Sequence, residues 1–491
     1  MRFKKTSKEI ILLFLILVIG FLLRIYKIDM PLADHHSWRQ ADTAAVARNF
    51  IKDGFDFLNP RVDNMAPVSK EVVFNPKRLF YVEPPIYQTI VFVLYKFTGV
   101  NEIVARGVSI FFSLGAIVFL FLLVKKLTNS ILALLSCLFM AVLPYSIYYS
   151  RVVMPESEML FTCIAMLYFF YNWLEKDNLK NFSLAVFFAA WALVVKTFPF
   201  FLGLPMFYLL WRKYSFSIIK KKKVWLFLIL ALIPFVLWRF WIQRAPEGIP
   251  SFPWLFNLNE IRFRPAFFRW IFAERIGKLI LGYWGLSFLS LGLAGKFAKK
   301  DGLFFHLWFL SFLIFISVFA SGNVTHDYYQ VAIIPILCFF LAKGAYFLLF
   351  ELPKSFNRIL SFGVFVVCFS FMMGFSWFEV NNFYFIQSGV DLAGEAVDRL
   401  TPKDALILTG DTADVTLLYN TNRHGWAGGY ASYIPNEEKA LNEAIERGAQ
   451  FYVTTKVGEL KSSGFGEFLY NEFKLMEESD QYALFDLRRG K

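Results

Sequence analysis

The stretch from Ile10 to Ile28, IILLFLILVIGFLLRIYKI, is apolar over a length that can cross a membrane as one helix. Basic residues at positions 2, 4, 5 and 8 precede it, so the beginning of the chain resembles a secretory signal peptide. The run is longer than such a peptide needs, and no small-residue cleavage site follows it. We therefore interpret it as an uncleaved first transmembrane helix.

The same pattern recurs along the first three quarters of the 491-residue chain, of which 57% is hydrophobic and 20% aromatic. Such long, nearly uncharged runs predict a mainly α-helical, polytopic membrane bundle rather than a soluble domain. The four cysteines all lie inside these runs, so no disulfide framework is expected. We expect about 11 spans, at residues 10–28, 105–124, 131–150, 156–174, 182–195, 197–211, 224–243, 277–295, 303–321, 329–350 and 359–378.

The net charge of +13 combines two unlike regions. The first 378 residues carry 40 basic and 20 acidic residues, whereas residues 379–491 carry 11 basic and 18 acidic. The basic residues cluster between apolar runs, which indicates membrane topology rather than nucleic-acid binding. We expect a bacterial or archaeal plasma membrane with the N-terminus in the cytoplasm. The basic clusters on the cytoplasmic side are then Lys125/Lys126, Lys176/Lys180, Arg212 to Lys223, Lys296/Lys299/Lys300 and Lys354/Arg358.

Two regions do not fit a simple count of spans. The run Ile86–Phe97 is too short to cross, and counting it would invert every later cluster, so we interpret it as an interfacial or re-entrant helix. The runs 182–195 and 197–211 are also short and meet at Lys196, which suits a tight hairpin. Neither exception changes the later topology.

Residues 29–104 then form the first outer loop, and the tail from residue 379 is also outside. The tail is soluble in character, and its hydrophobic pattern predicts a small α/β domain. The expected strands and helix are Asp404–Gly410, Gln450–Thr455, Tyr482–Leu487 and, for the helix, Glu437–Arg447. We divide the chain into a transmembrane domain at 1–378 and this extracytoplasmic domain at 379–491.

The first outer loop contains a dense polar stretch, PLADHHSWRQADTAAVARNF, from Pro31 to Phe50. Two carboxylates, two imidazoles and a guanidinium fall within nine residues, from Asp34 through His36 and Arg39 to Asp42. Pro31 and Asp34 suit a turn and a helix start, and Asp42 to Ile51 predicts an amphipathic helix that Asp42 opens. The alternative is a hydrated loop with a capping Asp and a surface Arg, but such density beside an apolar bundle is costly unless the groups face a cavity or a substrate.

Four further polar segments reach the same membrane face under this topology. Each has a plain structural alternative: Glu83 can cap a helix, and glutamates at a helix start favour its dipole. Their common location is the strongest physical indication of a site. The segments are Tyr81–Tyr87 with Glu83, Ser150–Glu158 with Arg151 and Glu156, Val195–Pro199 with Lys196, and Thr325–Gln330 with His326, Asp327 and Tyr329.

These five segments, in this order, resemble the family 39-like branch of the GT-C glycosyltransferases, which includes protein O-mannosyltransferases and aminoarabinose transferases. The resemblance covers roughly residues 10–350. Asp34–Phe50, closing on Ala47-Arg48, is similar to the acidic motif of the first loop, and Glu83-Pro84-Pro85-Ile86-Tyr87 to the paired-proline segment. Arg151 with Glu156, Lys196, and His326–Tyr329 are similar to the later polar positions.

The chain also departs from the family pattern. The adjacent Asp-Glu pair of the first loop is absent, which leaves open whether Asp34 or Asp42 takes the acidic role. Many relatives have a Lys before the paired prolines where this chain has Glu83, so phosphate must be met elsewhere. The candidates are Arg39, Lys196 and the arginines at 262, 264 and 269.

The resemblance implies inverting transfer of a sugar from a polyprenyl-phosphate donor to a lipid, glycan or protein acceptor outside the membrane. Asp42, Asp34 and Glu83 are the expected catalytic carboxylates, with Asp42 preferred as general base because it opens the predicted helix. Cations suit the leaving phosphate. The expected binding residues are Arg39, His36, Lys196, Glu156, Arg151, His326, Asp327 and Tyr329.

Two alternatives remain open at this point. Asp34, His36, Asp42 and Glu156 could ligate a divalent ion if they converge, although their spacing matches no specific site, and we expect no required metal. The chain could also be a transporter or flippase of lipid-linked sugars. That class predicts paired internal repeats with helices broken near mid-membrane, and we find no such symmetry in the sequence.

Overall fold

The computed structural model of this chain describes residues 2–66, 74–295, 302–353, 355–411, 415–427 and 436–488, with side chains described from Lys8 onward. The chain forms two compact units, each built from separate stretches of sequence. Unit 1 comprises residues 1–28, 106–239 and 252–383, and unit 2 comprises residues 29–105, 240–251 and 384–491. The predicted basic clusters at 296–300 and at Lys354 lie outside the described residues.

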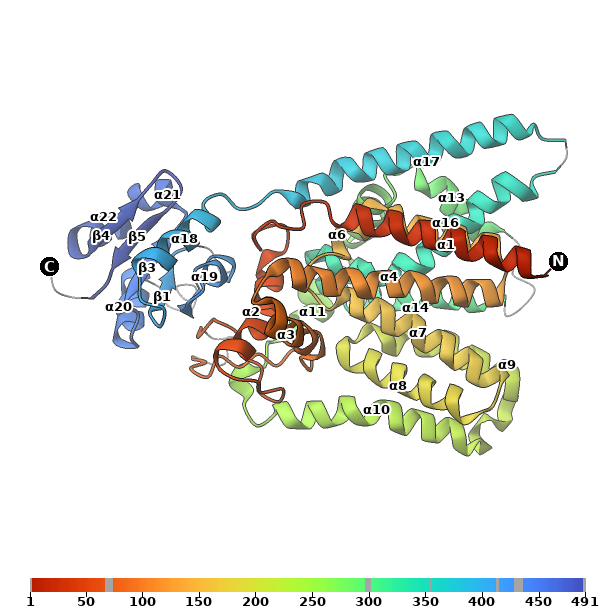
Figure 1. The fold of residues 1–491 in the computed structure, drawn as a ribbon, viewed down its shortest axis with the longest axis horizontal. Coiled ribbons are helices and arrows are strands. Elements are labelled where there is room, and N and C mark those ends of the chain that lie inside the picture. The colour runs from red at the N-terminus through yellow and green to blue at the C-terminus, as the bar shows by residue number, and fades with distance from the viewer. Residues whose placement is uncertain are drawn as a thin grey trace. The chain divides into compact units, whose positions relative to one another are not determined.

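Unit 1 is a helical bundle whose long helices run roughly parallel or antiparallel to one another (Figure 1). A helix is present at every predicted apolar run. The helices of unit 1, with α4 and α10 reaching its boundary, are α1 (Arg2–Arg24), α4 (Glu102–Leu127), α5 (Ser130–Val142), α6 (Pro144–Tyr149), α7 (Glu156–Glu175), α8 (Leu179–Val195), η1 (Phe198–Leu202), α9 (Gly203–Tyr214), η2 (Ser215–Lys220), α10 (Lys222–Ile242), α11 (Trp254–Asn257), η4 (Leu258–Phe263), α12 (Pro265–Phe268), η5 (Arg269–Ile280), α13 (Gly285–Ala294), α14 (Phe304–Val318), α15 (Ala320–Thr325), η6 (Asp327–Ile333), α16 (Ile334–Tyr346), η7 (Phe347–Glu351) and α17 (Arg358–Val380).

Length and hydropathy single out fewer membrane spans than the sequence predicts. Among the described residues, four helices are long and apolar enough to cross: 102–127, 222–242, 327–351 and 358–384. A fifth is added if the pair 265–280 and 285–294, bent by 114°, counts as one span, while α5, α8 and α14 are apolar but shorter. The number of eleven crossings therefore stays a prediction.

Close packing inside the bundle depends on small residues. A Cβ atom on Gly292 of α13 would lie 2.0 Å from the carbonyl oxygen of Phe340, and one on Gly344 of α16 would lie 2.0 Å from that of Phe288. Small side chains let helix backbones approach to this distance. The contact between α13 and α16 therefore requires glycine on both helices.

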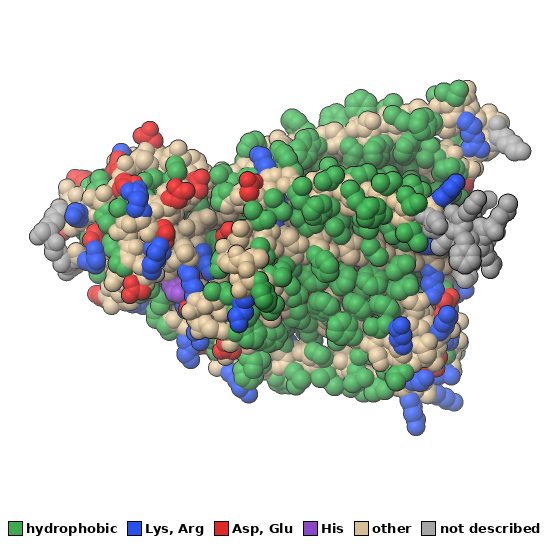
Figure 2. Space-filling view, in the orientation of Figure 1, with side chains coloured by type: hydrophobic (Ala, Val, Ile, Leu, Met, Phe, Trp, Pro, Cys, Tyr) green, Lys and Arg blue, Asp and Glu red, His purple; other side chains and the backbone are tan. Residues whose placement is uncertain are grey.

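The surface over α1, α4 and α17 is almost continuously hydrophobic, whereas Lys and Arg side chains gather at the end of the bundle where α1 begins (Figure 2). The four cysteines are buried and free, as the sequence predicts. An apolar surface with basic residues beyond one end is the pattern expected of membrane helices.

Unit 2 is built on a five-stranded mixed sheet with the strand order β2-β1-β3-β5-β4. The predicted strands are confirmed as β1 (Leu406–Thr409), β3 (Phe451–Thr454) and β5 (Ala483–Asp486), and the predicted helix as α20 (Glu437–Glu446). Strands β2 (His424–Trp426) and β4 (Lys474–Glu478) were not predicted. The remaining elements of this unit are α2 (Ser37–Lys52), α3 (Ile86–Thr98), η3 (Pro246–Gly248), η8 (Asn381–Tyr384), which straddles the boundary, α18 (Val390–Leu400), α19 (Thr416–Asn420), α21 (Val457–Lys461) and α22 (Gly464–Glu472).

The first outer loop and the tail fold together in unit 2. Asn64 forms a parallel bridge with Gly425, and the Met65 amide donates to the Gly425 carbonyl at 2.7 Å. Ala33 is buried in the same apolar cluster as residues of α18, β1 and β3. Unit 2 thus joins parts of the chain that the division at residue 378 places in different domains.

Candidate active site

Helix α2 carries two of the five predicted site residues of the first outer loop, Arg39 and Asp42, and it begins earlier than predicted. It starts at Ser37, after His36 in a left-handed conformation with φ of 55°, so Asp42 lies inside the helix. The prediction that Asp42 opens an amphipathic helix is therefore wrong. Every residue from Arg39 to Phe50 is buried, because polar side chains on this helix find partners within the unit instead of facing water.

Asp34 is held just before this helix. Its Oδ1 accepts a hydrogen bond of 2.7 Å from the Gln40 side-chain amide, and the Ser37 amide donates to its carbonyl at 2.9 Å. Asp34 and Asp42 are both buried, with exposures of 3% and 9%. Asp42 follows Arg39 by three residues, so both project from one face of α2.

Arg39 forms a buried ion pair with Glu83, and its guanidinium also lies 5.6 Å from the ring of Phe80. The alternative that Glu83 caps the following helix is wrong, because α3 has Pro85 at its N-cap and no side-chain capping bond. A carboxylate with a buried arginine within reach is more stable paired than at a cap. In unit 2 the structure thus brings together two predicted site residues from different segments.

In unit 1, Glu156 and Lys196 form a second ion pair, with 3.0 Å between Oε1 and Nζ. Glu156 begins α7 and Lys196 follows the end of α8, so the antiparallel helices carry both to one end of the bundle. The exposures are 4% and 18%. The Oε2 atom of Glu156 has no hydrogen-bond partner among the described residues. The neighbouring Glu158 accepts a 2.6 Å hydrogen bond from the indole of Trp191.

Asp327 is the centre of another polar cluster in unit 1. The hydroxyl of Tyr149 donates to its Oδ1 at 2.5 Å, and that of Tyr145 to its carbonyl at 2.6 Å. Arg275, on the π-helix η5, lies 3.3 Å from its Oδ2. Sequence reasoning missed Arg275 because it lies at the edge of an apolar run, and it named Arg262, Arg264 and Arg269 of the same loop instead. An arginine at the beginning of an apolar run was the available signal.

The remaining predicted residues of unit 1 have structural contacts. Arg151 is fully buried and donates to the Lys27 carbonyl at 2.7 Å, near the end of α1. His326 stacks on Tyr328 with 5.3 Å between ring centroids, and its ring lies 6.2 Å from that of Tyr329. These contacts fix the side chains in place, and a part in substrate binding stays a prediction.

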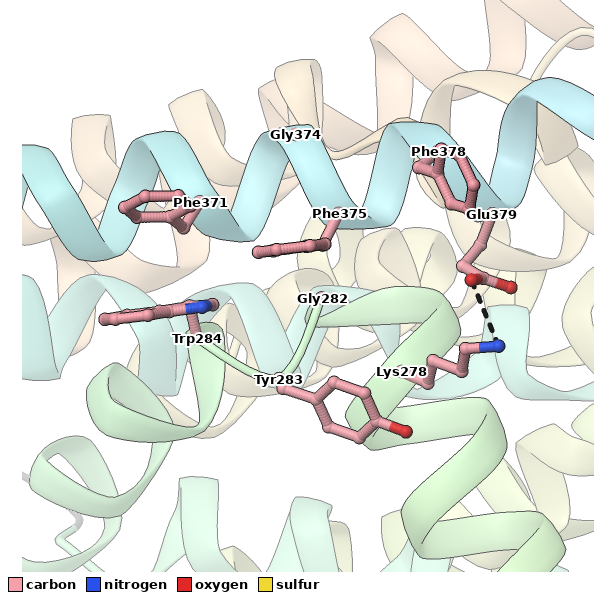
Figure 3. A pocket seen from close by; sticks show the side chains of 9 residues that line it. All are labelled: Lys278, Gly282, Tyr283, Trp284, Phe371, Gly374, Phe375, Phe378 and Glu379. Carbon is pink, nitrogen blue, oxygen red and sulfur yellow. Dashed lines mark ion pairs between the residues drawn. The ribbon is translucent and has the colours of Figure 1, made fainter.

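An apolar groove of about 660 Å³ lies in unit 1 between α17 and the break that separates η5 from α13 (Figure 3). Gly282, with φ of 47°, allows the break to lie against α17, where a Cβ would be 2.5 Å from the Met372 carbonyl oxygen. Aromatic rings form most of the wall, and an ion pair of 3.0 Å between Lys278 and Glu379 lies at one end. The rings belong to Tyr283, Trp284, Phe371, Phe375 and Phe378.

The predicted site residues are therefore brought together in part. Asp34, His36, Arg39, Asp42 and Glu83 belong to unit 2. The remaining members, which belong to unit 1, are Arg151, Glu156, Lys196, His326, Asp327 and Tyr329. The gathering of both groups in one cavity stays a prediction, as does the suggested divalent-ion set, which draws on both units.

Residues 82–241 match the model of the family described as dolichyl-phosphate-mannose-protein mannosyltransferase. The matched segment contains four of the predicted site residues: Glu83, Arg151, Glu156 and Lys196. No curated protein sequence matches the chain. The match covers part of the region over which the resemblance was noted.

Solved structures with a similar fold extend the comparison to nearly the whole chain. ArnT from Cupriavidus metallidurans bound to undecaprenyl phosphate has a TM-score of 0.66 at 14% identity, with 98% of each chain covered. The Archaeoglobus fulgidus oligosaccharyltransferase in complex with Zn and sulfate has a TM-score of 0.56 at 11% identity, covering 90% of this chain and 68% of that one. These likenesses show a mainly helical GT-C fold. With the family match over residues 82–241, they confirm the resemblance of this chain to the family 39-like GT-C glycosyltransferases.

Proposed function

We propose that this chain transfers a sugar from a polyprenyl-phosphate-linked donor to an acceptor on the extracytoplasmic face, with inversion at the sugar carbon. The family match carries the proposal, because the matched segment 82–241 includes the buried pair of Glu156 and Lys196. A buried ion pair at the end of an apolar bundle is costly, which favours a functional role for it. The acceptor is a lipid, a glycan or a protein.

The departing phosphate requires cations. In this proposal Lys196 supplies one, and its ammonium is oriented before substrate arrives by the 3.0 Å contact with Glu156. Charge-assisted hydrogen bonds to phosphate stabilise the leaving group in the transition state. Arg39, paired with Glu83, and Arg275, beside Asp327, are the other candidates.

The acceptor hydroxyl requires a base. We assign this role to Asp42, which shares a helix face with Arg39. Asp34 is the alternative, because Gln40 already orients its carboxylate. Asp42 lies inside α2 and not at its start, so its position relative to Arg39 supports the assignment. Replacing each residue separately decides between them.

The isoprenoid chain of the donor requires an apolar surface, and the aromatic groove along α17 offers one. Its rings suit hydrocarbon, and the Lys278–Glu379 pair at one end suits the polar head-group region. We propose that the groove receives part of the lipid chain. In the accompanying topology the N-terminus is cytoplasmic, the chain crosses a plasma membrane eleven times, and the sheet of unit 2 is outside.

We further propose that transfer requires no metal. Purified protein treated with EDTA should retain full activity, and restoration of a lost activity by a single divalent ion would contradict the proposal. Cationic side chains can supply the charge stabilisation that a metal otherwise gives. Asp34, His36, Asp42 and Glu156 would be the first residues to replace in that case.

The experiment that tests the function follows radiolabelled sugar from polyprenyl-phosphate donors incubated with the purified full-length chain. Release of sugar from the lipid and its appearance in a lipid, glycan or protein fraction is the expected result. Failure to release sugar from any donor, together with donor movement across vesicles, would favour the flippase. The Lys196→Met variant should lose most of the transfer and is the negative control. Lys180→Met replaces a lysine on the same helix pair, should retain transfer, and is the positive control.

A further inference from the structure

A second, polar pocket lies entirely within unit 2 and has no part in the proposed transfer chemistry. Its volume is about 300 Å³, at the small end of the range for ligand sites. Three segments meet there: α2, the connection from α3 to α4, and the turn that follows α19. The side chains that matter are Arg48, Lys52, Val100, Glu102, Tyr419 and Asn422.

Arg48 forms the buried wall of this pocket, with 5% of its surface exposed. It donates to Asp63 at 2.5 Å and to the Tyr419 carbonyl at 3.0 Å, and its guanidinium lies 4.0 Å from the Tyr419 ring. Its Nε atom has no hydrogen-bond partner among the described residues. The guanidinium is thus held in the wall of the pocket by Asp63 and Tyr419.

Lys52 adds a second cation one helical turn along α2. Its Nζ donates to the Asn422 carbonyl at 3.0 Å. Burial, and next the charge of Arg48, lower the pKa of Lys52 to about 8, so the lysine is still mostly charged at neutral pH. Asp63 already balances part of the charge of Arg48, and an anion bound beside Lys52 relieves the remaining repulsion between the two cations.

The rest of the lining suits a sugar ring. Glu102 already accepts a 2.8 Å hydrogen bond from the Tyr419 hydroxyl, which leaves its second oxygen to bond a sugar hydroxyl. Val100 and the Tyr419 ring provide apolar surface for the C–H face of a ring. Two cations, one of them already paired with Asp63, the Glu102 carboxylate and the small volume together suit one charged monosaccharide unit rather than a lipid.

We propose that this pocket binds an anionic saccharide unit, bearing a carboxylate or a phosphate, and that this unit belongs to the acceptor. The second clause rests on the proposed function, whereas the binding itself does not. Residues of the first outer loop, together with Tyr419 and Asn422 of the tail, would then recognise the acceptor glycan. The anion lies against Arg48 and Lys52, and the hydroxyls lie toward Glu102.

The test measures binding without donor, by calorimetry or saturation-transfer NMR on the purified full-length chain. Glucuronate and glucose 6-phosphate represent the carboxylate and phosphate forms, and glucose is the neutral comparison. We expect one or both anions to bind and glucose to bind at least tenfold more weakly. Lys52→Gln should weaken anion binding about tenfold, since it removes one charge-assisted contact. The control Lys96→Gln, which changes an exposed lysine of the same unit, should leave binding unchanged.

Absence of binding by both anions, or equal binding to wild type and Lys52→Gln, would overturn the inference. An active transferase that fails to bind these sugars would overturn this inference and leave the proposed function standing. Anion binding by a chain that transfers no sugar would overturn the proposed function and leave the binding inference standing. Thermal unfolding of each variant, matched to wild type, shows that lost binding is not lost folding.

Discussion

One ion pair from each unit illustrates two uses of buried charge in this molecule. In unit 2, Arg423 is fully buried and donates to Asp398 at 3.0 Å, to the Pro402 carbonyl at 2.7 Å and to the Thr401 carbonyl at 3.1 Å. In unit 1, Lys196 pairs with Glu156, whose second oxygen has no hydrogen-bond partner among the described residues.

The difference follows from the side chains involved. The planar fork of an arginine can satisfy several fixed acceptors at once, which suits an anchor that holds a turn. A lysine is a mobile point charge that can exchange its partner for a phosphate. We therefore interpret the Arg423–Asp398 pair as structural and the Glu156–Lys196 pair as part of the proposed phosphate-binding site.

The largest effect is expected from a residue outside both pairs. Asp42→Asn should lower the rate of sugar transfer by about 10² to 10⁴, the usual contribution of a general base, without lowering thermal stability. Asp34→Asn is the matched comparison, and the larger loss identifies the base. Normal transfer by both variants would end the assignment of either aspartate.

Lys196→Met should lower transfer by about 10² through loss of a phosphate contact, and should also destabilise the fold by about 3–5 kcal/mol because Glu156 is left buried and unpaired. Adding Glu156→Gln should restore most of the stability but none of the activity. Thermal unfolding and transfer assays on the single and double variants measure the two effects. Recovery of activity in the double variant would show that the ion pair has a structural role and no role in transfer.

Arg423→Met should show the opposite behaviour. The backbone carbonyls of Thr401 and Pro402 lose their donors, which costs about 2–4 kcal/mol of stability. Transfer per folded molecule, measured below the unfolding transition, should remain that of wild type. A loss of activity larger than the loss of folded protein would contradict a purely structural role.

Gly374→Leu tests the groove, because nothing lies within 4 Å of a Cβ at this position and the side chain would enter the open space. We expect the KM for the polyprenyl donor to rise about tenfold, which corresponds to a loss of about 1.4 kcal/mol of binding free energy, with little change in stability. Gly363→Leu, on the same helix with equally open surroundings and outside the groove, is the control. Equal KM values for the two variants would exclude the groove as the lipid site.

The smallest effect concerns pH. Burial lowers the pKa of His424 to about 4, whereas an unfolded histidine titrates near 6.5. The unfolded chain therefore binds the proton more readily, so this contribution to stability is complete above about pH 6.5 and is lost as the pH falls toward 4. We expect about 1 kcal/mol over this window, since the imidazole is partly exposed. His424→Gln should flatten the pH dependence of thermal unfolding, and an unchanged slope would contradict the assignment.

Local patterns in the sequence predicted much of this molecule. The apolar runs gave helices because a backbone without water partners must satisfy its own hydrogen bonds. The short apolar runs at residues 406–409 and 451–454 gave buried strands, and the ordered polar segments predicted the resemblance to GT-C glycosyltransferases. Strand β2 was not predicted, because its three residues around Gly425 are too few to show a hydrophobic periodicity.

Tertiary structure decided which polar groups meet. Glu83 pairs with Arg39 instead of capping α3, Arg275 reaches Asp327, and the first outer loop shares a core with the tail. Periodicity reports only how a residue faces its own helix or strand, whereas an ion pair depends on the approach of segments far apart in the chain. The sequence by itself therefore predicted most of the elements and the resemblance to GT-C glycosyltransferases, and the fold alone selected the partners of its charges.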